Sequence, residues 1–341
     1  MVKTMLSKEI HLIQYPVGFP NKDNFKLVQV QIPEPTKTGE FLVQNIWMSV
    51  DPYMRGRMRE EDNSYIPSFK LGQPLEGGCI GKVIASKNHQ FALGEYVLGM
   101  KGWREYWISN GSDVVKINQK IAPSQSFLGT FGMPGLTAYV GLLKIGELKE
   151  GETVFVSAAS GAVGSIACQI AKIKGCQVLG SAGSEDKVKW LIEQAKIDYA
   201  FNYKKIVDIS SEIKKFCPTK IDIYFDNVGG KHLEAAFYNM NNFGRIVLCG
   251  MISQYNSDHP IPVLSNLILA IINRLKIQGF IVSDYYNMLN EFQLSMSKWV
   301  KEGRIKWKET ILEGIESAPE AFIDLFKGIN FGKMLVKITP N

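Results

Sequence analysis

The fold is decided by one stretch of the sequence, residues 153–164, which read TVFVSAASGAVG. It begins with five residues, 153–157, that are typical of a strand and passes through a turn of small residues into a helical segment. Gly161 is expected to let the backbone approach a diphosphate, and Gly164 to let the helix pack closely on the strand. Unpaired N–H groups at the helix start favour an anion. The stretch therefore predicts a dinucleotide-binding turn, although Ala158 replaces the usual first glycine and a turn without a ligand is the alternative.

Strands alternate with helical segments from this stretch onward. Strands are expected at 177–182, 221–225, 245–249 and 276–282, and helices at 164–174, 184–196, 231–240, 264–275 and 285–302. Such alternation is typical of a parallel sheet with helices on both faces. The sequence therefore predicts an α/β fold with a doubly wound Rossmann sheet.

The end of the second strand indicates which dinucleotide binds. An NAD site usually carries an acid there to hold the ribose 2′-hydroxyl, but here the strand runs into Gly183 without one. Glu185 and Asp186 follow, where they complement the dipole of a helix start. Lys187 lies one turn into that helix, and Tyr203 follows the third strand, so both are candidates for holding a 2′-phosphate. This pattern favours NADP(H).

The first 125 residues or so differ from the middle of the chain. Glycine and proline separate short alternating runs such as 41–46 and 81–85, which is typical of a small β-rich, barrel-like domain. The run 333–338 is strand-like and is expected to return to that domain. The predicted domains are therefore 1–127, β-rich, 128–303, NADP-binding, and 304–341, the C-terminal return.

Composition excludes several classes of protein. The chain has 341 residues, of which 45% are hydrophobic and 21% charged, and a net charge of +6, as in an ordinary globular protein. The densest basic stretch, 301–308, carries an acid and is expected to be a solvated helix end, so no nucleic-acid partner is predicted. The apolar run 261–282 contains Arg274 and Lys276, so no membrane segment is predicted either. We expect the protein to be cytoplasmic.

Cysteine and histidine usage predicts no metal site. The five cysteines are scattered without a CxxC pair, so buried, reduced thiols are expected. The four histidines are isolated in the sequence. A catalytic zinc ion needs about three such ligands and a structural zinc ion needs four.

Further motifs occur outside the turn. They are SVDPYMRGRM (49–58), GMPGLTAY (132–139), FDNVGG (225–230), FGRI (243–246) and NFGK (330–333). In this order and spacing the chain resembles the zinc-independent medium-chain dehydrogenase/reductases, and within them the prostaglandin reductase, 2-alkenal reductase and curcumin reductase group. The resemblance implies that 1–127 is a GroES-like β-barrel-type catalytic domain, next to the Rossmann domain in the sequence. It also implies NADPH-dependent reduction of the C=C bond of α,β-unsaturated aldehydes and ketones, which are the expected small-molecule substrates.

The resemblance also implies which residues contact the cofactor. They are Gly161, Ala162, Val163, Gly164, Gly183, Lys187, Tyr203, Asn227, Cys249, Gly250, Met251, Ile252, Ser253, Tyr255, Phe280, Ile281, Val282 and Asn330. Met251 stands where related sequences often have a smaller side chain.

The reaction needs a hydrogen-bond donor for the substrate oxygen and a source of a proton. Tyr255 is the first candidate, because the loop after a parallel strand lines the ligand crevice, and the resemblance places the active-site tyrosine there. The alternative is an aromatic ring that packs on the cofactor. Tyr53 is the second candidate, and the neighbouring Arg55 and Arg57 are expected to pair with acids between the domains.

Two other functions stay open, an NADPH quinone oxidoreductase and an NADPH-binding scaffold without turnover. The expected strand Lys276–Val282 is an edge strand, which needs a partner to be protected from aggregation. Pairing of this strand with its twofold mate predicts a homodimer.

Overall fold

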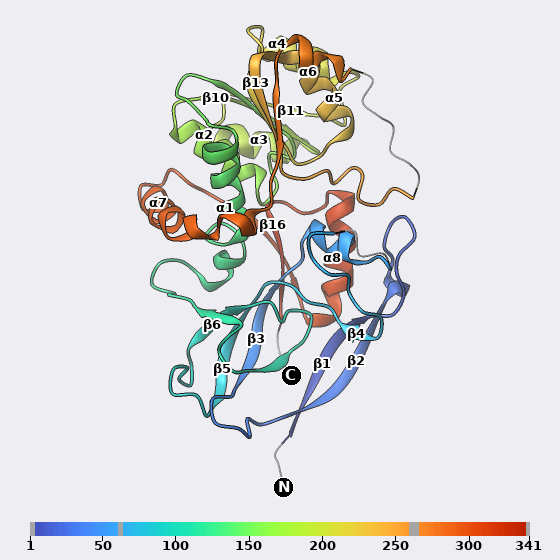
Figure 1. Ribbon diagram of the computed structural model, residues 1–341, viewed down its shortest axis with the longest axis vertical. Coiled ribbons are helices and arrows are strands. Elements are labelled where there is room, and N and C mark those ends of the chain that lie inside the picture. Colours follow the sequence, from blue (N-terminus) through green and yellow to red (C-terminus); the bar gives the residue numbers. More distant parts are fainter. Residues whose placement is uncertain (1–3, 61–63, 259–265, 339–341) are drawn as a thin grey trace. The chain divides into compact units, whose positions relative to one another are not determined.

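The computed structural model describes residues 4–60, 64–258 and 266–338, and the chain divides into two compact units (Figure 1). The first unit comprises Met1–Leu128, Glu309–Asn330 and Met334–Asn341. The second comprises Gly129–Lys308 and the short segment Phe331–Lys333. The first unit is therefore built from both ends of the chain, and the second from its middle and three residues near its end.

The second unit is built on a six-stranded sheet in which all neighbouring strands are parallel. Its order is β11-β10-β9-β12-β13-β14. The strands are β9 (Thr153–Val156), β10 (Gln177–Ala182), β11 (Tyr199–Asn202), β12 (Ile221–Asp226), β13 (Met240–Leu248) and β14 (Lys276–Gly279). The order reverses at β9, because the chain first runs outward to β11 and then crosses to β12. Ligands of such sheets bind beyond the carboxyl ends of the strands at this reversal.

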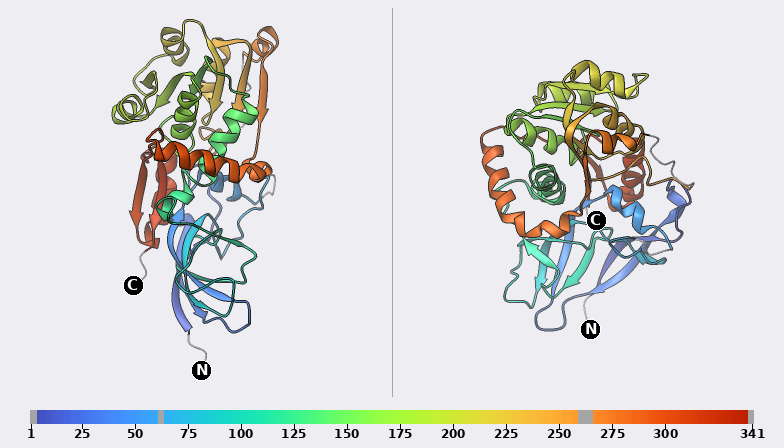
Figure 2. Two further views of the ribbon diagram at one scale, coloured as in Figure 1. Left: turned by 90° about the vertical axis from the view of Figure 1, so that its left-hand side faces the viewer. Right: turned by 45° about the horizontal axis from the view of Figure 1, so that its top comes forward.

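The helices of this unit lie on both sides of the sheet, and those between the first and last strand connect the strands (Figure 2). They are α1 (Met133–Val140), α2 (Gly164–Ile173), α3 (Glu185–Glu193), α4 (Ile209–Phe216), α5 (Gly230–Asn239), α6 (Ile268–Ile272) and α7 (Leu289–Lys301). Because parallel crossovers are right-handed, those leading outward from β9 in opposite directions place their helices on opposite faces. The predicted doubly wound α/β fold is confirmed.

Several predicted boundaries are wrong. β13 begins at Met240 rather than Arg245, and β9 ends at Val156 rather than Ser157. The edge strand ends at Gly279 rather than Val282, and the chain continues as a 3₁₀ helix, Val282–Met288. Tyr285 interrupts that segment with a φ of −120°, so the long helix begins at Leu289. The helix after β10 ends at Glu193, and Lys196 beyond it has a φ of 56°, which an α-helix does not accommodate.

The apolar helix expected at 264–275 is shorter than predicted. Helix α6 spans Ile268–Ile272, and residues 264–265 lie outside the described part of the chain. Several of its isoleucines are exposed, including Ile271 at 73%. Among the described residues, no helix combines the length and the apolar character needed to cross a membrane.

Two sheets form the first unit, and most of their neighbouring strands are antiparallel. One has the order β2-β1-β4, and the other has the order β15-β16-β3-β5-β6-β8 with β7 paired to β3. The strands are β1 (Thr4–Leu12), β2 (Phe25–Pro33), β3 (Phe41–Ser49), β4 (Gln73–Pro74), β5 (Cys79–Ser86), β6 (Tyr96–Gly99), β7 (Tyr106–Ser109), β8 (Val114–Lys116), β15 (Glu309–Glu313) and β16 (Lys333–Lys337). A helix, α8 (Ala318–Lys327), and a 3₁₀ helix, η2 (Pro52–Arg57), complete the unit.

Aromatic side chains pack within the core of each unit. In the first unit Trp103 is fully buried, stacks on Phe25 with 6.0 Å between ring centroids and meets the edge of Phe322 on α8. In the second unit Phe155 of β9 stacks on Tyr224 of β12 at 5.0 Å. Because β9 is buried at every position, it is a rigid base for the turn that follows it.

Candidate active site

The glycine-rich turn joins β9 to α2 at the carboxyl edge of the sheet. Ala158 has a φ of 47°, so alanine here adopts the left-handed conformation for which glycine is usually preferred. The Gly161 N–H donates to the Ala158 carbonyl at 2.9 Å, which tightens the turn. Gly164 is required sterically, because a Cβ there would lie 2.3 Å from the same carbonyl oxygen. Ala162 and Val163 are only half-buried, so the turn that leads into α2 is accessible to an anion. The N–H groups of Ser165 and Ala167 already donate to the carbonyls of Gly161 and Val163, so the backbone of 162–164 is the part of the turn that faces such a ligand.

Polar side chains converge where β10 and β11 end. A Cβ at Gly183 would lie 3.4 Å from both the Tyr203 hydroxyl oxygen and Lys204 Cε, so both side chains reach this position. Lys187 is buried on the first turn of α3. Its pKa is lowered mainly by burial and to a smaller extent by the charge of Lys204. Two ammonium groups and a phenol therefore gather just beyond β10. These are the groups that bind a phosphate.

The carboxylate at the start of α3 has its own partners. Glu185 Oε1 accepts a hydrogen bond from Asn202 Nδ2 at 3.0 Å and forms an ion pair with Lys205 at 3.2 Å. The side-chain oxygen of Ser184 caps the helix by accepting from the Lys187 N–H at 3.4 Å. Sequence reasoning found Lys187 but not Lys204, although its place directly after Tyr203 at a strand end was an available signal.

Tyr203 packs against the ring of His232. The edge of one ring meets the face of the other, with 5.1 Å between the Tyr203 and His232 centroids. Burial lowers the pKa of His232 to about 4, so its imidazole is neutral at pH 7. His232 therefore packs without adding a charge to the group of lysines. Burial also raises the pKa of Tyr203, which keeps its phenol protonated and able to donate.

Hydrogen bonds join the loops that follow β9, β12 and β13. The Asp226 carboxylate is fully buried and accepts from the Tyr224 hydroxyl and from the N–H groups of Val228 and Gly229. Asn227 donates through Nδ2 to the Ser157 carbonyl at 2.7 Å. Asp226 thus shapes the loop that carries the predicted cofactor contact Asn227, a role that sequence reasoning did not assign.

The loop after β13 is held by the same segment. The N–H groups of Cys249 and Gly250 both donate to the Asp226 carbonyl, at 2.9 and 3.0 Å. Ile252 and Ser253 donate in turn to the carbonyls of Asn227 and Val228, so the two loops run together. The cofactor contacts that the resemblance implies at Asn227 and at 249–253 are therefore brought to one place.

Tyr255 turns back over this loop. Its phenolic oxygen accepts a hydrogen bond from the Met251 N–H at 3.2 Å, and a Cβ at Gly250 would lie 3.1 Å from that oxygen. Burial raises the pKa of Tyr255, and the nearby Cys249 and Asp226 also raise it. The phenol is therefore protonated at neutral pH, and with its oxygen accepting from a backbone amide its O–H is a competent donor.

The other predicted contacts fall into two groups. Phe280, Ile281 and Val282 follow β14 at the same carboxyl edge, and the Phe280 ring lies 3.0 Å from the position of a Cβ at Gly141. Asn330 belongs to the first unit, as does Tyr53, which lies on η2. The structure thus gathers every predicted contact of the second unit at one edge of its sheet.

The arginines beside Tyr53 differ from each other. Arg57 pairs with an acid, Glu76, at 3.2 Å, but both residues belong to the first unit, whereas the prediction is a pair between the domains. Arg55 is buried, and the prediction that it pairs with an acid is wrong, because its Nη2 donates to the backbone carbonyls of Pro16 and Gly18 at 3.0 and 2.9 Å. It therefore fastens a loop to the 3₁₀ helix that carries Tyr53.

Metal-ligating groups do not cluster in the described part of the chain, where no three His, Cys, Asp or Glu side chains are placed to hold an ion. All five cysteines are free thiols, as predicted. Burial raises the pKa of Cys249, the one nearest Tyr255, to about 12, so it is an unreactive thiol at neutral pH.

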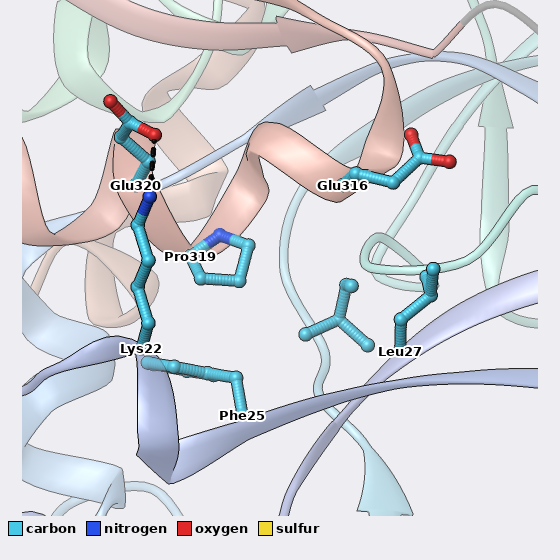
Figure 3. Close-up of a pocket in the computed structure, with 7 residues that line it drawn as sticks. Lys22, Phe25, Leu27, Glu316, Pro319 and Glu320 are labelled. Carbon is cyan, nitrogen blue, oxygen red and sulfur yellow. Dashed lines mark hydrogen bonds and ion pairs between the residues drawn. The ribbon is translucent and has the colours of Figure 1, made fainter.

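A small cavity in the first unit is separate from these residues. It measures about 190 Å³ and lies between β1, β2 and the start of α8 (Figure 3). Its lining consists of Ile10, Lys22, Phe25, Leu27, Glu316, Pro319 and Glu320. The two acids at its rim are already paired, Glu320 with Lys22 at 3.0 Å and Glu316 with Lys8 at 2.6 Å. None of the predicted site residues lines it.

Comparisons with known proteins agree with this geometry. Residues 8–117 match the family described as the N-terminal domain of oxidoreductase, and residues 162–302 match the zinc-binding dehydrogenase family. The chain is 42% identical to the NADP(+)-dependent 2-alkenal reductase of Nicotiana tabacum, over 99% of both chains. It is 41% identical to the NADPH-dependent curcumin reductase of Escherichia coli, over 96% of this chain and 95% of that one. The crystal structure of CurA from Vibrio vulnificus in complex with NADPH superposes with a TM-score of 0.92 at 41% identity, covering 98% of this chain and all of that one.

Proposed function

Since the chain belongs to the medium-chain dehydrogenase/reductase family, in the group of the 2-alkenal and curcumin reductases, we propose that it reduces the C=C bond of α,β-unsaturated aldehydes and ketones with NADPH. One observation carries the proposal. The glycine-rich turn, the lysines beyond β10 and the phenol of Tyr255 lie along the carboxyl edge of one sheet. A reductase of this kind needs a diphosphate site, a 2′-phosphate site and a proton donor in that arrangement.

The residues present fit NADP(H). Gly164 leaves the space that a side chain would fill, and the start of α2 offers N–H groups to the diphosphate. Lys187, Lys204 and the Tyr203 hydroxyl would hold the 2′-phosphate. The position where an NAD site carries an acid is Gly183, which has no side chain. NADPH, when bound, supplies the hydride.

The protein's part in the chemical step falls to Tyr255. Its phenol is protonated at neutral pH and would donate to the substrate carbonyl oxygen, where negative charge develops as the β-carbon is reduced. Burial in the loop limits the water that competes for this donor. Tyr53 is the second candidate for the same role. Asn227 and the 249–253 segment would position the reacting end of the cofactor.

NADPH absorbance tests the proposal. Purified protein is mixed with a medium-chain trans-2-alkenal, an alkyl enone or a quinone, with NADH as the control cofactor. We expect NADPH to be oxidised with the alkenal and the enone and little oxidation with NADH. The variant Tyr255→Phe should lower kcat/KM about 10²-fold, the size of a lost general-acid contribution, while the NADPH Kd changes less than twofold.

Each other result points elsewhere. Turnover with the quinone alone would make the chain a quinone oxidoreductase. NADPH binding without turnover of any acceptor would favour the scaffold function. A Tyr255→Phe variant as active as the wild type would mean that this ring only packs on the cofactor.

We also propose a homodimer and a cytoplasmic location. β14 is the last strand of the six-stranded sheet, so its outer edge carries backbone groups that a second copy would pair. Exposed isoleucines of α6 lie close by in the chain, including Ile268 and Ile271. The five free thiols are typical of a reducing compartment.

A further inference from the structure

A three-residue segment from near the C-terminus lies on the glycine-rich turn. Phe331–Lys333 belongs to the second unit, although the residues before and after it belong to the first. The Gly332 N–H donates to the Ser160 carbonyl at 2.9 Å, and Gly332 pairs with Gly161 as an isolated parallel bridge. We call this segment the strap. It touches the peptide unit at which the phosphate-binding turn bends.

The other side of the strap is equally confined. The Lys333 N–H donates to the Lys308 carbonyl at 3.0 Å. Gly332 has a φ of 70°, and a Cβ there would lie 1.9 Å from the Lys308 carbonyl oxygen, so only glycine fits. The backbone at Gly332 is therefore held between Ser160 on one side and Lys308 on the other.

Lys308 itself follows a segment that is anchored to α2. Gln169 is buried on that helix, and its side chain both donates to the Lys306 carbonyl and accepts from the Lys306 N–H, each at 2.8 Å. Contacts thus lead from α2 through Gln169, the 306–308 segment and the strap back to Ser160, at the turn that precedes α2. These contacts therefore tie the turn to the helix that follows it through a second route besides the chain itself.

The strap also contacts the helix that carries Lys187. The Phe331 ring meets the Trp190 ring edge-on, with 5.5 Å between centroids and 84° between planes. Trp190 is buried and lies three residues after Lys187 on α3, so the two side chains share one side of that helix. One short segment therefore touches both elements that would bind phosphate groups.

We propose that the strap is a positioning element for the phosphate-binding turn, in which Gly332 fixes the Ser160–Gly161 peptide and Phe331 fixes α3. The proposal rests on the proposed function in one respect, that NADPH is the ligand. Residues of the strap act through the turn and through α3 rather than by taking part in the chemical step. Loss of the strap should therefore weaken cofactor binding and leave the chemical step largely unchanged at saturating NADPH.

Gly332→Ala tests this against a matched control, Gly328→Ala. Both glycines have a left-handed φ, 70° and 67°, so both substitutions introduce similar backbone strain. At Gly328 nothing lies within 4 Å of the new Cβ, whereas at Gly332 the Lys308 carbonyl blocks it. We expect Gly332→Ala to raise the Kd and KM for NADPH about tenfold or more, the equivalent of about 1.4 kcal/mol, with kcat within threefold of the wild type. Gly328→Ala should leave the Kd for NADPH unchanged.

Hydrogen exchange supplies a second measurement that needs no cofactor. In the protein without NADPH, the amides of residues 158–166 should exchange faster in Gly332→Ala than in the wild type or in Gly328→Ala. Phe331→Ala should likewise raise the Kd for NADPH and speed the exchange of these amides. Phe331→Tyr keeps the ring, so both quantities should stay near those of the wild type. These two variants carry the test if Gly332→Ala fails to fold.

Equal NADPH affinity and equal exchange in the strap variants and in Gly328→Ala would overturn the proposal. A uniform loss of protection throughout the second unit would also overturn it, because the strap would then be a general structural element. If the wild type does not bind NADPH or reduce enones, the proposed function fails, and the exchange rates still decide whether the strap holds the turn.

Discussion

Lys187 keeps its ammonium group where two effects disfavour a charge. Burial is the larger effect and the charge of Lys204 the smaller, and both lower the pKa of Lys187. A dianionic phosphate beside both side chains would reverse both effects, since it favours the charged form. The lowered pKa of Lys187 therefore fits a site shaped to receive an anion.

Lys187→Ala and Lys204→Ala should each raise the KM for NADPH about 10- to 100-fold, the loss of one hydrogen bond to a charged group. The KM for NADH, which lacks the 2′-phosphate, should change little. Because the pKa of Lys187 is lowered, NADPH affinity should begin to fall with rising pH sooner than it would with an ordinary lysine. Steady-state kinetics with both cofactors over an alkaline pH series measures all three effects.

Lys205→Ala is the control for those two variants, since this neighbouring cation pairs with Glu185. It should leave the ratio of the two KM values near that of the wild type. A ratio unchanged in Lys204→Ala as well would remove Lys204 from the site and leave Lys187 and Tyr203 as its residues.

At the scale of elements, two arginines of the 3₁₀ helix η2, which also carries Tyr53, bind neighbouring loops of the first unit. Arg55 fastens the loop that contains Pro16 and Gly18, and Arg57 donates through Nε to the Pro67 carbonyl at 2.8 Å. Burial lowers the pKa of Arg55 to about 10, so it is still charged at neutral pH. A buried guanidinium that donates to carbonyls makes strong, charge-assisted hydrogen bonds.

Arg55→Met should lower the free energy of unfolding by about 2 kcal/mol, because two backbone carbonyls lose a charged donor. The free energy of unfolding of Arg55→Lys should lie between those of the wild type and the methionine variant, since one ammonium group does not reproduce the guanidinium fork. Urea unfolding measures the loss, and limited proteolysis should cut near exposed Val17 more readily in the methionine variant.

The exposed neighbour Arg59, replaced by methionine, is the control and should change the free energy of unfolding by less than about 0.5 kcal/mol. Equal losses at both positions would contradict the clamping role of Arg55.

What the sequence predicts well at this scale is local. The strand, turn and α2 follow from residues 153–164 because small residues, a glycine at 164 and an apolar strand act on their own neighbours. Ser184 signals the start of α3 for the same reason. The carbonyl partners of Arg55 lie 37 and 39 residues away in sequence, and the strap reaches Ser160 only through the fold. Such contacts leave no periodic pattern, so sequence reasoning expected an acid beside Arg55 and did not foresee the strap.

At the scale of the whole molecule, the homodimer that we propose rests on the exposed edge of the second unit. β14 is the last strand of its sheet, and Ile268 and Ile271 of α6 are 58% and 73% exposed. Phe243, within the neighbouring strand β13, is 67% exposed as well. An apolar edge of this kind is a liability in a monomer, and a second copy related by a twofold axis would cover it with the same residues.

The double variant Ile268→Lys, Ile271→Lys should therefore be a monomer where the wild type is a dimer. Two lysines on each copy would place four like charges in an apolar interface, where charges without partners are costly to bury. Light scattering coupled to size-exclusion chromatography at micromolar concentration gives the mass. Leu294→Lys is the matched control, because Leu294 is 75% exposed on α7 of the same unit and should leave the dimer intact. A wild type of monomeric mass would show that no dimer forms, and a double variant that stays dimeric would place the interface on another face. Circular dichroism and thermal unfolding of the double variant should match the wild-type fold, so that a change in mass reports the interface alone.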